Sequence, residues 1–370
     1  MRGMSWPDPP RPHLPSDPHD RGEWEDGAPP ARADRLVALQ VLREEAEREG
    51  FTRVGVAAVA PPPKFERYRA WLAGGLHAGM EYLRRTAAMR ADPGTLLPGA
   101  RTILCLSSPH PAASPIAADG SRIARYAFGS DYHWRLRRRA IAVAERSAAR
   151  IGPFRYRACV DSAPLSERSF AAAAGLGWIG KNGCLIDPDR GSFILLAEVL
   201  TDLDLPVDSP VAEQCGSCVR CLEACPTDAF VEPGVVDAGR CIAYWTIEHR
   251  GAIPDSMKPA IAEHVFGCDI CQEVCPWNGP VLRDAGPSPA GLPTRSEWLA
   301  TGPGAWRRRW AGTALARAGR RGIQRNAAIS SGAASHAAAL PALVAAREAR
   351  EPGLADAAAW AADRLGAGAR

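Results

Sequence analysis

The chain has 370 residues, of which 46% are hydrophobic, and its formal net charge at pH 7 is +4. This length and apolar content suit two or three domains with buried cores, and they exclude a small scaffold held together by disulfides. No apolar run reaches about 18 residues, and the amino terminus lacks the apolar stretch of a secretion signal, so we expect a cytoplasmic protein with no membrane span.

Taken in chain order, the sequence opens with a segment unlike the rest. Residues 1–33 are rich in Pro, Asp and Arg and poor in aliphatic side chains. Such a segment cannot bury enough apolar surface to offset the entropy lost on folding. We therefore predict a disordered tail there.

Residues 34–205 carry alternating helix and strand patterns. An amphipathic pattern from Asp34 to Gly50 predicts a helix that ends at a glycine. Short apolar runs predict strands at residues 51–59, 103–106 and 193–200, and helical patterns occupy residues 134–149 and 166–174. This alternation predicts an α/β domain.

Polar residues are concentrated at two places in this domain. Residues 124–133 combine charged and aromatic side chains just before a predicted helix, and Asp161 follows a predicted strand. Clefts of α/β domains form where strands end, and a carboxyl group there can act as a general acid. Helix capping by Asp131 or Asp161 would give the same local pattern, so that alternative stays open.

The cysteines between residues 215 and 275 are the most informative feature of the chain. The run from Cys215 to Pro226 has the spacing C-x2-C-x2-C-x3-C-P, which is typical of bacterial iron–sulfur proteins. In that motif three thiolates hold one cluster and the fourth binds a second cluster. A second group from Cys268 to Pro276 keeps the C-x2-C-x3-C-P ending but lacks one cysteine, which Cys241 can supply.

Eight cysteines therefore divide into two sets of four, each expected to hold one [4Fe-4S] cluster. The first cysteine set consists of Cys215, Cys218, Cys221 and Cys275. The second cysteine set consists of Cys225, Cys241, Cys268 and Cys271. Zinc is the main alternative because tetrahedral zinc sites also use C-x2-C pairs, but four cysteines in one run ending in proline favour iron–sulfur clusters.

Two further domains are predicted after residue 205. Residues 206–285 indicate a ferredoxin-like domain folded around both clusters. Residues 286–370 are rich in Ala and predict short helices at 327–336, 340–349 and 354–365, like a pair of HEAT-like repeats. Seven arginines and no acid lie between Thr301 and Arg325, which indicates an anionic partner such as phosphate, with a solvated helix face as the alternative.

In combination, these motifs resemble the epoxyqueuosine reductase family. The residues that carry the resemblance are Asp131-Tyr132-His133, residues 161–186, both cysteine groups, residues 241–251 and residues 322–328. The resemblance covers about residues 35–370. It implies an enzyme that removes the epoxide oxygen of epoxyqueuosine at the wobble position of tRNA, giving queuosine, with cobalamin and two [4Fe-4S] clusters as cofactors. It also implies a monomer that receives electrons from an external low-potential donor.

The resemblance further implies roles for single residues. Asp161 corresponds to the proposed proton donor; it can donate only when protonated, and burial against the corrin would raise its pKa. Arg317, Arg321 and Arg325 correspond to arginines that meet tRNA phosphates. The positions that correspond to the cobalamin site are Arg90, Ala124, Asp131, Asp161, Leu185, Ala243, Arg250 and Gly267. His133 is not expected to ligate cobalt, because Leu136 stands where the usual Asp-x-His-x-x-Gly motif has glycine.

Two other functions stay open at this stage. A reductive dehalogenase also combines a corrinoid with two such clusters, but it usually carries an export signal and lacks the arginine-rich helical segment. A ferredoxin-type electron carrier would need only the cysteine sets. The carrier predicts neither bound corrin nor any change in tRNA.

Overall fold

A four-stranded sheet forms the centre of the amino-terminal half of the protein. The computed structural model describes residues 35–367, so the predicted tail at residues 1–33 lies outside the described residues. The strand order is β1 (Arg53–Ala58), β2 (Thr102–Pro109), β7 (Ile194–Thr201) and β4 (Tyr156–Cys159). The predicted strands are confirmed, and every neighbouring pair is antiparallel.

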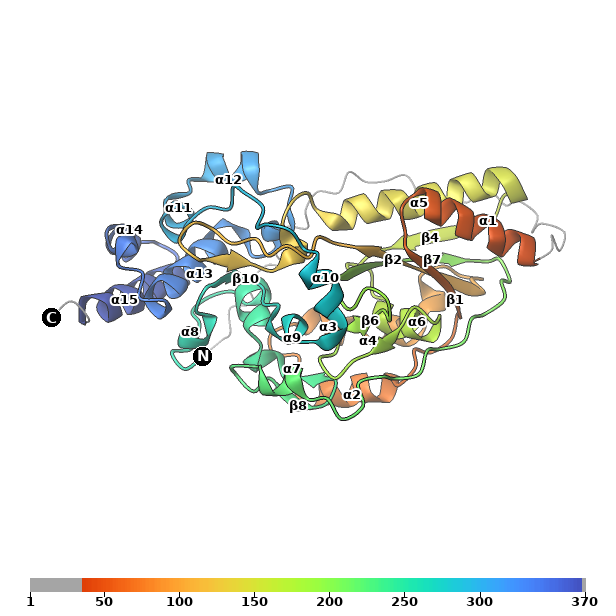
Figure 1. Ribbon diagram of the computed structural model, residues 1–370, viewed down its shortest axis with the longest axis horizontal. Helices are drawn as coiled ribbons and strands as arrows, with labels where there is room; N and C mark the ends of the chain where they lie inside the picture. Colours follow the sequence, from red (N-terminus) through yellow and green to blue (C-terminus); the bar gives the residue numbers. More distant parts are fainter. Residues whose placement is uncertain (1–34, 368–370) are drawn as a thin grey trace.

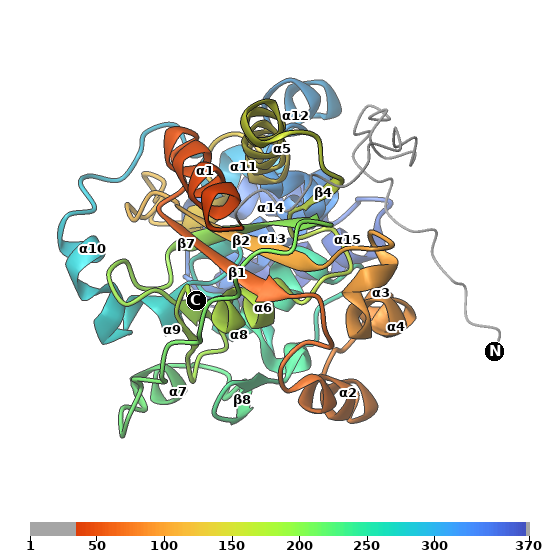
Figure 2. The ribbon, with the colours of Figure 1, turned by 90° about the vertical axis from the view of Figure 1, so that its right-hand side faces the viewer.

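Helices cover both faces of this sheet. Helices α1 (Arg35–Arg48) and α5 (Tyr132–Ile151) lie on one face, and α6 (Glu167–Ala173) lies on the other (Figures 1 and 2). All three helices were predicted from the sequence and are confirmed. Each has a mainly apolar side that covers the sheet, as amphipathic surface helices require.

Strand β7 shows how the sheet separates two parts of the core. Ala197 and Val199 belong to the hydrophobic cluster under α1 and α5. Leu196 and Leu200 belong to the cluster under α6, because alternate side chains of a strand point to opposite faces. Glu198 shares the α6 face with these leucines, although it is an acid.

Short elements surround α6 and connect the sheet to the rest of the molecule. They are α2 (Phe65–Ala73), α3 (Glu81–Arg85), α4 (Ala87–Ala91), β5 (Trp178–Ile179) and β6 (Leu185–Ile186). Strands β5 and β6 pair with each other in an antiparallel hairpin. This hairpin carries the glycine-rich stretch toward the cysteine-rich segment.

The cysteine-rich segment folds into small elements beside the sheet. They are α7 (Arg220–Glu223), β8 (Phe230–Glu232), β9 (Val235–Val236), α8 (Lys258–Ile261), β10 (His264–Phe266), α9 (Ile270–Glu273) and α10 (Gly279–Arg283), with a π-helical turn at Tyr244–Glu248. Strand β10 pairs in parallel with β3 (Arg122–Ile123). A loop of the amino-terminal half therefore reaches into the cysteine-rich segment.

The carboxy-terminal region is helical and forms the other end of the molecule (Figure 1). Its helices are α11 (Arg295–Ala300), α12 (Pro303–Arg309), α13 (Gly319–Ala333), α14 (Leu340–Ala346) and α15 (Pro352–Ala367). The helix predicted at 327–336 is the second half of the longer helix α13, which contacts α8, α11, α15 and β10.

One hydrophobic cluster runs through the whole molecule, from Leu39 in α1 to Leu354 in α15. The sheet and the carboxy-terminal helices therefore share continuous packing through β10. The domain boundaries after residues 205 and 285 stay predictions. Among residues 35–367, no helix combines the length and apolar character that a bilayer crossing needs.

Candidate active site and cysteine sets

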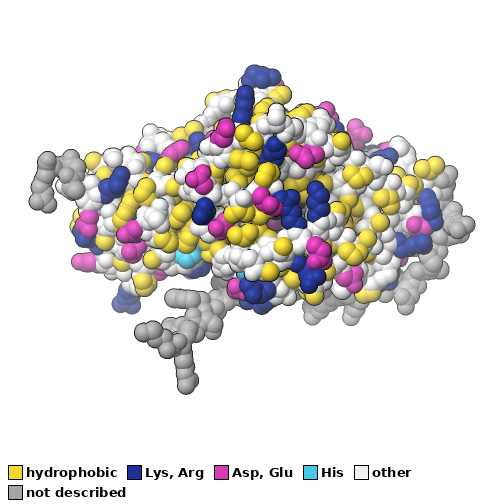
Figure 3. Space-filling view, turned by 90° about the horizontal axis from the view of Figure 1, so that it is seen from below, with side chains coloured by type: hydrophobic (Ala, Val, Ile, Leu, Met, Phe, Trp, Pro, Cys, Tyr) yellow, Lys and Arg dark blue, Asp and Glu magenta, His cyan; other side chains and the backbone are white. Residues whose placement is uncertain are grey.

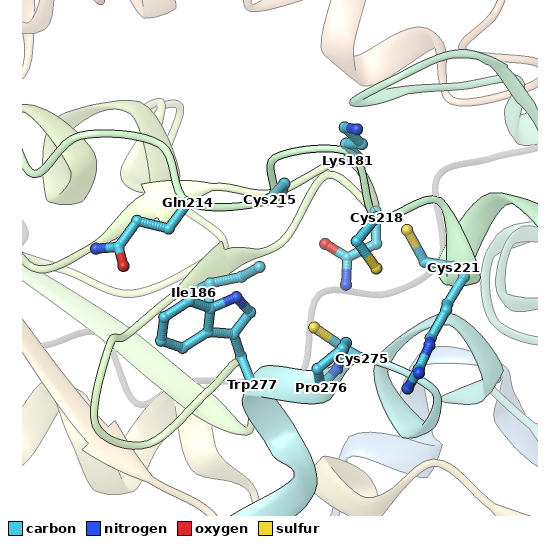
Figure 4. A pocket seen from close by; sticks show the side chains of 11 residues that line it. Lys181, Ile186, Gln214, Cys215, Cys218, Cys221, Cys275, Pro276 and Trp277 are labelled. Atoms are coloured by element: carbon cyan, nitrogen blue, oxygen red, sulfur yellow. The ribbon is translucent and has the colours of Figure 1, made fainter.

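The first cysteine set surrounds a pocket beside α7. Three of its members lie on the loop that enters α7 and on the helix itself, and Cys275 comes from the turn after α9. With Lys181 and Trp277, the four cysteines line a cavity of about 280 Å³. Figure 4 shows the sulfur atoms of Cys218, Cys221 and Cys275 around one space. The structure thus brings Cys275 to the cysteines of the other motif.

The members of the second cysteine set are electrostatic neighbours of one another. The charges of Cys225 and Cys241 act on Cys268, and the charges of Cys268 and Cys241 act on Cys271. Burial raises the pKa of Cys268 to about 12. Bare thiolates are therefore unfavourable here, and metal ions of a cluster would supply the compensating positive charge.

Neither set has the geometry of a single-ion site. In the part of the chain that the structure describes, no three Cys, His, Asp or Glu side chains converge on a position for one metal ion. The thiolates of a [4Fe-4S] cluster bind different irons, so they surround a volume. The cavity lined by the first cysteine set has that arrangement.

Asp161 lies at the centre of a hydrogen-bonded group of polar side chains. Its Oδ2 atom accepts a hydrogen bond from the Tyr132 hydroxyl at 2.6 Å and another from His133 Nε2 at 2.8 Å. His133 Nδ1 lies 2.7 Å from Asp131 Oδ1. Both imidazole nitrogens therefore face carboxylate oxygens, and both contacts are hydrogen bonds only when the ring carries two protons.

Local backbone geometry places these groups together. Asp131 caps α5 by accepting a hydrogen bond from the His133 backbone N–H, so the first turn of α5 presents Tyr132 and His133. Asp161 follows β4 in the left-handed region, with φ of +51°, where residues other than glycine are uncommon. Its backbone N–H donates to the Glu167 carboxylate, which holds the turn in place.

The proton of this group resides on His133 rather than on Asp161. Desolvation raises the pKa of Asp161, but the hydrogen bond and charge of His133 outweigh it and lower the pKa to about 2. Desolvation lowers the pKa of His133, but the bonds to Asp131 and Asp161 outweigh it and raise the pKa to about 9. With only protein groups around it, Asp161 therefore has a lowered pKa. This is the opposite of the raised pKa that burial against the corrin was expected to cause.

Several predicted cofactor-binding positions meet where β10 joins the π-helical turn. Gly267 has φ of +70°, and its backbone N–H donates to the Thr246 hydroxyl at 3.0 Å. A Cβ atom on Gly267 would lie 2.6 Å from the Cβ of Ala124. Ala243 precedes the π-helical turn, a type of distortion that is frequent at functional sites.

Arg250 and Arg317 join this region to the side of the Asp161 group. Arg317 pairs with Glu248 through two hydrogen bonds of 2.6 and 2.9 Å, and its guanidinium lies over the Tyr82 ring. Arg250 donates to the backbone oxygen of Arg317. The charge of Asp161 acts on both Tyr82 and Arg317. Arg317 is therefore near the candidate active site as well as on the helical side.

The remaining predicted positions occupy different surroundings. Arg90 is half-buried and donates to the backbone oxygen of Leu165 at 2.8 Å, and the side chain of Leu185 is buried in β6. Arg321 is exposed at the start of α13. The structure brings most of these residues near the Asp161 group or the π-helical turn, whereas Leu185 lies in the core beneath α6.

Arg325 does not have the exposed position that a phosphate contact needs. Its side chain is 2% exposed, and it donates to the backbone oxygens of Trp245, His249 and Gly251 at 2.7 to 3.0 Å. Its donors are committed to the segment after the π-helical turn. In this structure the expected phosphate contact of Arg325 is therefore replaced by a structural role.

Sequence reasoning gave no chemical role to Tyr132, His133, Glu167 or Glu198. The first two lie in the polar and aromatic stretch before α5, and their proximity to Asp161 could not be derived without the fold. Glu198 had a signal of its own, since it is a lone acid in an apolar strand pattern.

Comparisons with known proteins place these features in one family. Epoxyqueuosine reductase of Xanthomonas campestris pv. campestris is 44% identical over 255 residues, which span 67% of this chain and 72% of that protein. The chain belongs to the epoxyqueuosine reductase family. The enzyme of Pseudomonas aeruginosa is 41% identical over 252 residues, which span 66% of this chain and 70% of that protein. Members of this family are oxidoreductases, and so is this protein.

Two family models match parts of the chain. The model described as epoxyqueuosine reductase QueG, DUF1730 matches residues 90–162. The model of a 4Fe-4S double cluster binding domain matches residues 214–278, which include all eight cysteines of both sets. The iron–sulfur domain predicted from cysteine spacing is therefore confirmed.

Solved epoxyqueuosine reductases share the fold over nearly the whole chain. A crystal structure of one with an epoxyqueuosine-modified tRNA-Tyr stem loop has a TM-score of 0.80 at 28% identity and covers 90% of this chain and 91% of that chain. The Bacillus subtilis enzyme, in a state with an aspartate-bearing catalytic loop swung out of the active site, has a TM-score of 0.82 at 28% identity, with the same coverage.

Proposed function

We propose that this protein removes the epoxide oxygen of epoxyqueuosine in tRNA, giving queuosine, with cobalamin and two [4Fe-4S] clusters as its cofactors. The observation that carries the proposal is the relation to epoxyqueuosine reductases over both the catalytic half and the cluster domain. The solved relative that holds a modified tRNA stem loop supports tRNA as the substrate.

The first and second cysteine sets would each hold one cluster. The first set already surrounds a cavity, and the second set places the desolvated thiols of Cys241, Cys268 and Cys271 within reach of one another's charge and, for Cys241 and Cys268, of the charge of Cys225. Cys225 and Cys275 would each bind the cluster that is held mainly by the other motif. This crossing would keep the two clusters adjacent. Adjacent clusters suit the transfer of single electrons from a low-potential donor toward the active site.

The residues present fit a cobalamin that binds without a histidine ligand. Both ring nitrogens of His133 are hydrogen-bonded to carboxylates, so neither is offered to a metal. Arg90, Ala124, Asp131, Ala243, Arg250 and Gly267 would hold the cofactor together with Asp161, whereas the side chain of Leu185 packs in the core beneath α6. When bound, cobalamin supplies a cobalt centre that passes electrons to the substrate.

The protein itself would manage the proton chemistry. Negative charge develops on the epoxide oxygen as its bonds to carbon break, and a positioned acid stabilises that charge by protonating it. His133 Nε2 is hydrogen-bonded to Oδ2 of Asp161. A proton held by the His133 imidazolium would therefore pass to Asp161 Oδ2 and from there to the epoxide oxygen. Tyr132 keeps this carboxylate oriented through its own hydrogen bond.

Exposed arginines near the Asp161 group offer a surface for the tRNA. Arg307, Arg308 and Arg309 are exposed on α12, and the loop after α12 contacts α5, because Gly312 O accepts a bond from the Asp131 N–H. On α5, Trp134 is 48% exposed with the Arg138 guanidinium over its ring. Arginines beside an exposed aromatic ring suit RNA phosphates and an unstacked base.

Anaerobic turnover of epoxyqueuosine-containing tRNA tests the reaction. Reconstituted protein with cobalamin should remove one oxygen mass from the wobble nucleoside, as read by mass spectrometry, and protein without cobalamin should not. Asp161→Asn should retain both cofactors and lose about 100-fold or more in kcat, because general acid catalysis typically contributes that much. Wild-type turnover in this variant would remove Asp161 from the mechanism. No conversion by the loaded wild type would reopen the dehalogenase and carrier alternatives.

Iron content tests the assignment of cysteines to clusters. Cys275→Ala should reduce the iron of reconstituted protein by about half, because the first cluster loses a ligand while the second keeps all four. Cys184→Ala is the matched control, since this cysteine lies near Cys221 and Cys275 of the first set and Cys271 of the second but outside the motifs. Equal iron loss in both variants would contradict the assignment.

A further inference from the structure

A completely buried glutamate lies behind the Asp161 group. Glu198 is 0% exposed, and the sheet register places it between Cys105 of β2 and Cys159 of β4. No N–H, hydroxyl or cationic group of residues 35–367 donates to either of its carboxyl oxygens, and its hydrogen-bonding neighbour is the carboxyl of Glu167. A buried carboxylate with neither donor nor cation is costly, so its presence in this apolar core requires a reason.

The group that faces Glu198 is a second carboxyl. It belongs to Glu167 in the first turn of α6, and each of the two glutamates acts on the other. Glu167 also accepts the hydrogen bond from the Asp161 backbone N–H, so this glutamate pair is joined to the loop of the proton donor. Hereafter the glutamate pair means Glu167 and Glu198.

The charges around the glutamate pair favour protonation. Asp161 raises the pKa of both members, and Arg90 is the cation that acts on Glu167. The neighbours of Glu198 across the sheet are the thiols of Cys105 and Cys159, which are neutral because burial raises their pKa. Apart from Arg90, the surroundings therefore provide little positive charge.

Two carboxyl groups in such contact cannot both ionise at neutral pH. Burial and the charge of Asp161 raise the pKa of Glu167 to about 8, and burial with the charge of Glu167 raises the pKa of Glu198. The pair thus retains protons next to Asp161, a carboxylate that has lost its own. The pair therefore holds its protons beside the loop of Asp161, whose backbone N–H donates to Glu167.

We propose that the glutamate pair is a proton store that resupplies Asp161 during epoxide reduction; this inference rests on the proposed function. Removing the oxygen breaks two C–O bonds, forms one C=C bond and consumes two electrons and two protons, because the oxygen leaves as water. The external donor supplies the electrons through the clusters. His133 supplies the first proton through Asp161, and Glu167 supplies the second. The proton of Glu198 then re-protonates Glu167, and solvent later returns one proton to Glu198 and one to His133.

Infrared spectroscopy of the purified protein with its clusters tests the store without turnover. At neutral pH the wild type should show a protonated-carboxyl C=O band that shifts in D₂O. This band should weaken strongly in Glu198→Gln. Glu45→Gln is the matched control, because Glu45 is also buried but pairs with Arg48 and Arg150, and this variant should leave the band unchanged. A band unchanged in Glu198→Gln would overturn the proposal.

The pH dependence of kcat separates a proton store from a merely structural pair. In Glu198→Gln no second acid re-protonates Glu167 after it has given up its proton, so kcat should fall, and the loss should grow as pH rises through the Glu167 pKa of about 8. Glu167→Gln keeps the acceptor for the Asp161 N–H and should lose about 10-fold to 100-fold in kcat with little change in KM. Loss by one factor at every pH in both variants would contradict the store. The infrared band is measured without turnover. Wild-type turnover with an unchanged band in Glu198→Gln would therefore reject the store alone, whereas absence of wild-type turnover would reject the proposed function.

Discussion

Asp161 is ionised, and the proton that it would donate resides on the neighbouring His133. Asp131 and Asp161 together hold His133 as an imidazolium, and Tyr132 fixes the shared Oδ2 atom. The strained backbone of Asp161 is maintained by Glu167. Asp161 can be ionised before the reaction and still protonate the substrate, because it can receive the proton of His133. Its low pKa is therefore compatible with the proposed role.

Replacing His133 should remove a pH-dependent contribution to stability. Because its pKa is raised to about 9 in the folded protein, the contribution is complete below the unfolded pKa of about 6.5 and is lost as pH rises through about 9. The difference in Tm between wild type and His133→Gln should therefore be large near about pH 6 and small near about pH 10. His249→Gln is the control, since burial lowers the pKa of His249 to about 4 and leaves it neutral throughout. A His133 difference that grows with pH would refute the imidazolium.

At the scale of elements, the π-helical turn and β10 bring the second cysteine set beside the candidate cofactor region. Arg325 and Asn326 of α13 hold this junction by donating to backbone oxygens on both sides, including those of Thr246 and Val265. Gly267 provides the close approach to β3. The helical region therefore stabilises the cluster domain.

Gly267→Ala should lower the free energy of unfolding by more than the cost of its left-handed backbone conformation. Gly267 and Gly286 both have φ of +70°, but a Cβ meets nothing within 4 Å at Gly286 and lies 2.6 Å from the Ala124 Cβ at Gly267. Gly286→Ala should lose about 1–2 kcal/mol for the left-handed backbone. Gly267→Ala should lose about 1–3 kcal/mol more for the overlap and should bind less of the second cluster. Equal losses in denaturant unfolding would show that β3 and β10 move apart easily.

At the scale of the whole molecule, charge is distributed unevenly. Positive and negative side chains are interspersed on the face shown in Figure 3. The side that carries α12 and the start of α5 has exposed arginines and no acid between Thr301 and Arg325. Under the proposed function, this one-sided charge would attract the tRNA to the side of the molecule that carries α12.

Replacing Arg307, Arg308 and Arg309 by Ala should weaken tRNA binding and lower its salt dependence. If each arginine meets one phosphate, the slope of log Kd against log salt should fall by about 2–3. Replacing Arg67 and Arg69 of α2 serves as the control, because α2 lies on the opposite side of the molecule (Figures 1 and 2). An unchanged slope in the α12 variant would make α12 a solvated helix face.

The sequence by itself determined the parts whose information is local. Cysteine spacing predicted the iron–sulfur domain, and side-chain periodicity predicted the sheet and its covering helices, because both depend on residues close together in the chain. Partners distant in sequence were decided only by the tertiary structure: His133 with Asp161, Glu198 with Glu167, and Arg325 with the segment after the π-helical turn. These contacts set the protonation and exposure of each group, so only the fold reveals which acid is ionised, which stores a proton and which arginine is available to a phosphate.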